Sequence, residues 1–85
     1  MHRRELLGRL VEGRLRNVSF RDFCGLVEGF GFTLDRVRGS HHVYHRSGLV
    51  ARLVLQSAGG EAKPYQIRQF LALVEEYDLR LEDEA

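Results

Sequence analysis

Three of the four histidines of this chain stand within five residues, in the run Gly39-Ser40-His41-His42-Val43-Tyr44-His45-Arg46. Imidazole can both accept and donate a proton near neutral pH, so such a cluster suits general acid–base chemistry. The tyrosine and the arginine in the same run indicate an anionic substrate, because a guanidinium pairs with phosphate and carboxylate groups. We take this run as the candidate site, which the neighbouring elements must position.

Two amphipathic helices are predicted, one before and one after the histidine run. The first is capped by Ser19, carries apolar residues at helical spacing and ends at Gly29 or Gly31. The second has Pro64 in its first turn, where proline is tolerated, and runs to about Tyr77. Each helix has one apolar stripe to bury.

Three strands are predicted between these helices, over residues 32–37, 41–46 and 49–55. Ser47-Gly48 indicates a two-residue hairpin between the second and third strands. We therefore expect an α+β fold with the order α-β-β-β-α. In this fold a three-stranded antiparallel sheet packs two helices on one face and leaves the other face open.

The chain of 85 residues is long enough for one domain. Residues 1–18 are predicted to be a basic arm or a short helix, because Gly8 and Gly13 each cost a helix roughly 1 kcal/mol. The domain proper is expected over residues 19–77, followed by an acidic tail over residues 78–85. The basic arm is as consistent with a solvated surface as with phosphate contacts.

The net charge is only +1, but its sign is unevenly distributed along the chain. Residues 1–58 carry ten basic and five acidic side chains, whereas residues 59–85 carry three and seven. Arginine supplies twelve of the thirteen cations, and its planar guanidinium favours phosphate recognition. The near-zero total does not give the broad positive surface of a typical nucleic-acid-binding protein.

Cys24 is the only cysteine, so no intramolecular disulfide forms. It shares a helical face with Phe20, Phe23 and Val27 and is expected to be a buried core residue; a reactive thiol is the alternative. The sequence has no apolar run that suggests a secretion signal or a membrane span, so we expect a cytoplasmic protein.

Strand alternation divides the histidine run between the two faces of the sheet. His42, Tyr44 and Arg46 fall on one side, and His41, Val43 and His45 fall on the other. The apolar Val43 favours burial of this second side. The open face would then carry His42 beside an aromatic ring and a guanidinium. The alternative is that His41 and His45 are part-buried and hydrogen-bonded, with His42 on the surface.

This arrangement suits RNA cleavage. The imidazole of His42 can take a proton from a ribose 2′-hydroxyl, and Arg46 can stabilise the charge that develops on the attacked phosphate. Tyr44 can stack on an unpaired base, and Gly39 with Ser40 lets phosphate approach the backbone. No metal or other cofactor is predicted. Strand residues four apart lie roughly 13 Å from each other and cannot share one ion, so a zinc site at His41, His42 and His45 would need this run to be helical or sharply bent.

The element order and the run Gly39-Ser40-His41-His42-Val43-Tyr44 resemble the HicA toxins, small bacterial proteins of type II toxin–antitoxin systems. The resemblance extends over roughly residues 19–77. It implies a fold like that of double-stranded-RNA-binding domains and translation-independent cleavage of mRNA. The essential histidine of the family corresponds to His42, which leaves His41 a supporting role at most.

The resemblance also implies partners, namely mRNA and an antitoxin of the HicB type that masks the histidine-bearing face and forms a complex with the toxin. We expect RNA contacts from Gly39, Ser40, His41, Tyr44, Arg46, Lys63 and Arg68. Two other classes of function stay open: an RNA-binding module without catalysis, and a protein-interaction domain.

Overall fold

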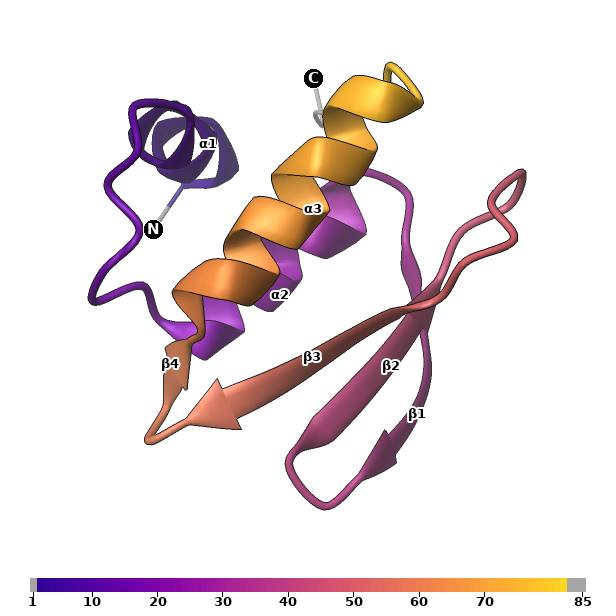
Figure 1. Cartoon of the computed structure of the whole chain (residues 1–85), viewed down its shortest axis with the longest axis horizontal. Helices are drawn as coiled ribbons and strands as arrows, with labels where there is room; N and C mark the ends of the chain where they lie inside the picture. Colours follow the sequence, from indigo (N-terminus) through magenta and orange to yellow (C-terminus); the bar gives the residue numbers. More distant parts are fainter. Residues whose placement is uncertain (1, 83–85) are drawn as a thin grey trace.

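The chain forms three helices and a four-stranded antiparallel sheet within residues 2–82, the part that the computed structural model describes (Figure 1). The elements in chain order are α1 (Arg3–Val11), α2 (Phe20–Gly29), β1 (Thr33–Arg38), β2 (His41–His45), β3 (Leu53–Ala58), β4 (Glu61–Ala62) and α3 (Pro64–Glu76). The strands lie in the order β1-β2-β3-β4, so β1 forms one edge of the sheet.

The predicted α+β class and the double-stranded-RNA-binding-domain-like arrangement are confirmed. Both predicted helices form: Ser19 caps α2 by accepting a hydrogen bond from the Asp22 N–H at 3.2 Å, and Pro64 lies in the first turn of α3. The sheet has one strand more than expected, because residues 61–62 pair with the end of β3.

The prediction of a two-residue hairpin at Ser47-Gly48 is wrong. The Leu49 N–H bonds to the Arg46 carbonyl at 3.1 Å and closes a turn there, but pairing with β2 resumes only where Leu53 lies opposite Tyr44. The third strand therefore begins four residues later than residue 49, the predicted start. Val50, which the alternation placed in that strand, is fully exposed in the connection between β2 and β3.

Aromatic rings form the centre of the core. The ring of Phe70 from α3 lies edge-to-face against Phe23 of α2 at 5.5 Å between centroids, against the α2 C-cap residue Phe30 at 5.4 Å, and against Phe32 at 6.0 Å. Tyr44 and the β3 leucines belong to the same buried cluster. The sheet thus has an inner face packed against α2 and α3, and an outer face turned away from them.

The first helix is a packed part of this core. His2 caps α1 through its Nδ1 atom, and Leu6 and Leu10 are each 1% exposed. After α3 the chain passes the end of α2, where the Glu82 N–H bonds to the Gly29 carbonyl at 2.7 Å. The last three residues of the predicted acidic tail, 83–85, lie outside the described part of the chain.

Two glycines of the α2 region are expected to respond oppositely to alanine. A Cβ at Gly25 would meet nothing within 4 Å, so Gly25→Ala should raise the free energy of unfolding by about 0.5–1 kcal/mol through helix propensity. Gly31 has a φ of +91° and its Cβ would lie 3.1 Å from Arg46 Nε, so Gly31→Ala should lower it by about 1 kcal/mol or more.

Urea denaturation of the two variants and the wild type measures both effects. A stabilised Gly31→Ala variant would contradict the left-handed backbone at this position.

Candidate functional site

His42 lies on the inner face of the sheet, beside α2. It pairs with Leu55 and Tyr44 pairs with Leu53, and both leucines are fully buried against the helices. The prediction that His42, Tyr44 and Arg46 project from the open face is therefore wrong. Tyr44 is 1% exposed, because its large ring buries more apolar surface than Val43 would and its hydroxyl still reaches a polar partner.

Val43 lies on the outer face, opposite Val54 of β3 and Arg36 of β1. Val43 is only 7% exposed, although its face is turned away from α2 and α3. His41 and His45 share the face and are exposed, which also contradicts the alternative that they are the part-buried histidines.

A groove of about 470 Å³ lies between α2 and the β1–β2 hairpin. Helix α2 contributes Phe20, Arg21, Cys24, Gly25 and Glu28 to its lining, and the strands contribute Leu34, His42 and Tyr44. The helical residues stand one and two turns apart, so they form one stripe along α2. The groove thus combines apolar walls with an imidazole, a carboxylate and a guanidinium.

The His42 ring is held by packing. Its centroid lies 4.9 Å from that of Phe20, edge-to-face at 70°. The Nδ1 atom is buried and has no hydrogen-bond partner within residues 2–82, the single side-chain atom there of which this is true. Leaving a buried polar atom unpaired costs about 1–3 kcal/mol, and such exceptions in native proteins are often found at functional groups.

Tyr44 joins the sheet to α2 through polar contacts at the back of the groove. Its hydroxyl donates a hydrogen bond of 2.8 Å to Glu28 Oε2 and also interacts with the Cys24 thiol. Burial, the two hydrogen bonds and the Glu28 charge raise the pKa of Tyr44 far above 10.0. Burial likewise raises the pKa of the Cys24 thiol, which stays neutral at pH 7, as a buried core cysteine should.

Arg46 lies apart from the groove. Its Nε atom donates to the Phe30 carbonyl at 2.8 Å, at the C-terminal end of α2, and its side chain is half-buried. Arg46 therefore satisfies a helix-end carbonyl and is not among the groove's lining residues.

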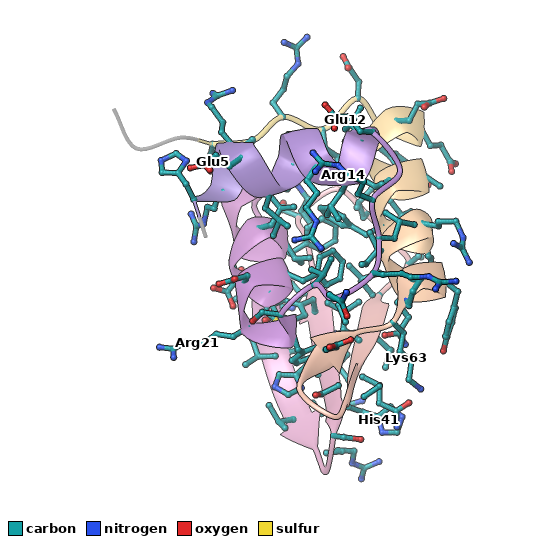
Figure 2. All side chains as sticks on the ribbon, turned by 90° about the vertical axis from the view of Figure 1, so that its left-hand side faces the viewer. Glu5, Glu12, Arg14, Arg21, His41 and Lys63 are labelled. Carbon is teal, nitrogen blue, oxygen red and sulfur yellow. The ribbon has the colours of Figure 1, made fainter. Side chains whose placement is uncertain are left out.

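The remaining predicted RNA contacts are not among the lining residues of the groove. Gly39 and Ser40 form the exposed turn between β1 and β2, and Ser40 accepts a hydrogen bond from Gln56, which in turn accepts one of 2.7 Å from Lys63 Nζ. Figure 2 shows His41 and Lys63 on one side of the molecule and Arg21 on the other. Arg68 is exposed on α3.

The sequence reasoning missed Arg21 and Glu28. Both belong to α2, and the second lies sixteen residues before Tyr44, its hydrogen-bond partner. Their spacing to Cys24 on one helical stripe was visible, but the placement of that stripe beside His42 depends on which face Tyr44 occupies. Among the described residues, no group of three or more histidines, cysteines and carboxylates could hold a metal ion.

The sequence pattern of a known family matches most of this chain. The family described as the HicA toxin of bacterial toxin–antitoxin systems matches residues 20–75, which include α2, the sheet and nearly all of α3. The chain therefore belongs to the HicA toxin family. Searches of curated proteins and of solved structures gave no significant match. None of the helices within residues 2–82 combines the length and the apolar character that a bilayer crossing requires.

The Tyr44 hydroxyl should make a pH-dependent contribution to stability. Because the folded-state pKa lies above 10.0, the protonated phenol contributes fully below about pH 10, and this contribution is lost as the pH rises further. Tyr44→Phe should lower the free energy of unfolding by about 1 kcal/mol at neutral pH. The difference in the free energy of unfolding between the wild type and the variant should become smaller above about pH 10.

Urea midpoints at about pH 7 and about pH 11 for both proteins measure this dependence. A difference that stays constant over this range would contradict the buried, carboxylate-bonded phenol.

Proposed function

We propose that this HicA-family toxin is a metal-independent endoribonuclease that cleaves mRNA and uses His42 as its general acid–base group. The observation that carries the proposal is the place of His42: its ring lines an open groove together with Arg21 and Glu28, and its Nδ1 atom is buried without a partner. Packing against Phe20 holds the ring in one orientation, as a proton-transferring group requires.

In the proposed reaction, the imidazole of His42 takes the proton from a ribose 2′-hydroxyl. The resulting oxyanion attacks the adjacent phosphorus, the bond to the 5′-oxygen breaks, and that oxygen leaves with a proton from solvent. The products are a 2′,3′-cyclic phosphate and a 5′-hydroxyl end. DNA lacks the attacking 2′-hydroxyl and should not be cleaved.

Arg21 takes the place that the sequence suggested for Arg46. It is exposed, lines the groove and belongs to the same helix as the Phe20 ring against which His42 packs. A guanidinium there can pair with the phosphate and stabilise its growing charge. Arg46 instead donates a hydrogen bond to the Phe30 carbonyl at the C-terminal end of α2.

Lys63, Arg68 and the Gly39–His41 turn are further candidates for contact with the RNA backbone. The chain of hydrogen bonds from Lys63 through Gln56 to Ser40 connects the start of α3 with this turn. Figure 2 shows His41 and Lys63 away from Arg21, so we propose that this group of residues positions a longer RNA and does not act on the cleaved bond. Tyr44 is a positioning residue, because its ring is too buried to stack on a base.

The proposed partner is an antitoxin of the HicB type that blocks access to the groove. Membership in a toxin family of toxin–antitoxin systems supports such a partner. A protein that covers the α2 side of the groove would keep RNA from His42 without any change in the fold.

Replacement of His42 tests the proposed reaction. His42→Gln should lower the rate of RNA cleavage by about 10²–10⁴-fold, because glutamine cannot take up a proton at neutral pH. RNA affinity should stay within about tenfold of the wild type, since binding depends on other groups. Gel analysis of a labelled single-stranded RNA, with EDTA present and antitoxin absent, measures the cleavage.

His45→Gln is the matched control, because His45 is exposed on the outer face and should keep full activity. Equal cleavage by His42→Gln and the wild type would overturn the role of His42. If the wild type and His42→Gln both bind RNA but neither cleaves it, an RNA-binding module is favoured. If neither protein binds or cleaves RNA, a protein-interaction domain is favoured.

Arg21→Gln should lower kcat/KM for cleavage by about ten- to a hundredfold, through the lost stabilisation of phosphate charge. Arg36→Gln removes the same charge from the outer face and should have little effect. The two variants are compared on one RNA substrate at low salt, where phosphate contacts are strongest. Equal losses in both would indicate that only the total charge matters.

A further inference from the structure

We propose that the groove beside His42 is a nucleobase subsite, which selects bases that carry an amino group through the carboxylate of Glu28. This inference deepens the proposed function, because it names the part of the RNA that the groove holds. It assigns a binding role to Glu28, for which the proposed cleavage reaction has no use.

The size and the walls of the groove fit a flat heterocycle. Its volume of about 470 Å³ lies within the range of roughly 300–1,000 Å³ that is common for small-molecule sites. Leu34 is 40% exposed at the edge of the sheet, and together with Phe20 it gives the groove apolar surface. Unstacked RNA bases are commonly held against such apolar and aromatic side chains.

Gly25 keeps the groove open. It lines the groove in the middle of α2, and a Cβ added there would meet nothing within 4 Å. A residue with a side chain would fill part of this space. The glycine has a negative φ inside a helix, so its backbone conformation does not require it. Glycine is disfavoured inside a helix, and the need to keep the groove accessible offers a reason for its presence at position 25.

Glu28 is the acceptor that the groove offers to a base. Its Oε2 atom accepts the Tyr44 hydroxyl hydrogen at 2.8 Å, which fixes the orientation of the carboxylate. An ionised carboxylate has about four acceptor sites on its two oxygens, so acceptor capacity remains for a ligand. The residue is exposed, and its carboxylate can therefore meet a base that enters from solvent.

This chemistry ranks the four bases. Guanine presents two neighbouring N–H donors on its Watson–Crick edge and matches a carboxylate best, whereas adenine and cytosine each offer an amino group. Uracil has one N–H between two carbonyl oxygens, and these oxygens repel a carboxylate. The subsite should therefore favour bases with an amino group and disfavour uracil.

The position of the base follows from the position of His42. The histidine that takes the 2′-hydroxyl proton and the carboxylate that reads the base line the same groove. The base in the groove thus belongs to the nucleotide that supplies the attacking hydroxyl, on the 5′ side of the cleaved bond.

The test uses four RNAs that differ only in this nucleotide, with the wild type and Glu28→Gln as enzymes. The wild type should cleave after guanine, adenine and cytosine at least roughly tenfold faster than after uracil. Glu28→Gln keeps an acceptor for Tyr44 but adds a donor that suits uracil, so the difference should fall to about twofold. Equal cleavage after all four bases by the wild type, or the same ranking in the variant, would overturn the proposal.

Two further variants separate the subsite from general effects. Gly25→Leu places a side chain in the groove from a position where a Cβ meets nothing within 4 Å, and it should remove both cleavage and base preference without lowering the thermal unfolding temperature. Glu76→Gln removes a charge at the exposed end of α3 and should keep the wild-type ranking. A Gly25→Leu variant that folds and retains the base preference would contradict the subsite.

Binding of 2′-deoxy oligonucleotides, measured by fluorescence anisotropy, distinguishes the failure of this inference from that of the proposed function. These ligands cannot be cleaved by the proposed reaction, but they carry the same bases. A base preference in binding that depends on Glu28, without any RNA cleavage, would support the subsite and overturn the endoribonuclease. Cleavage that depends on His42, without any base preference, would support the endoribonuclease and overturn the subsite.

Discussion

The burial of Tyr44 between the sheet and α2 is the constraint on which the site depends. Side chains of a strand alternate between its two faces, so a tyrosine that faces the helices brings the residue two positions earlier to the same side. That residue is His42, and it meets α2 at Phe20. The hydrogen bond from Tyr44 to Glu28 then fixes how α2 is rotated against the strand. One buried ring thus decides what surrounds the histidine.

Helix α2 carries two stripes with separate roles. Phe23 and the C-cap residue Phe30 pack in the aromatic core around Phe70, which holds the helix on the sheet. Arg21 and Glu28 lie on the neighbouring stripe, along the groove. Because both stripes belong to one rigid helix, the packing of the core also determines where the charged groups stand. The candidate site therefore needs no mobile loop to assemble it.

Helices α2 and α3 and the three strands between them were predictable, since Ser19, Pro64 and the apolar spacing are local signals. The end of the β2–β3 connection was not, because Leu49 and Ala51 continue the alternation of a strand although pairing begins only at Leu53. The face occupied by His42 also escaped prediction. Val43 and Tyr44 are both buried, so hydrophobicity alone does not distinguish the inner face from the outer one. The groove depends on contacts between residues sixteen positions apart, which no local pattern reveals.

The contacts at the two ends of the described chain show that packing extends beyond the family match. The family match covers residues 20–75, yet Leu6 and Leu10 of α1 are as deeply buried as the central phenylalanines, and Glu82 is bonded to the end of α2. A fragment cut to the matched residues would expose apolar surface on α2 that the intact chain covers. The segment matched by the family is thus shorter than the part of the chain that packs together. If this segment were transferred into another protein, other residues would have to cover the exposed apolar surface of α2.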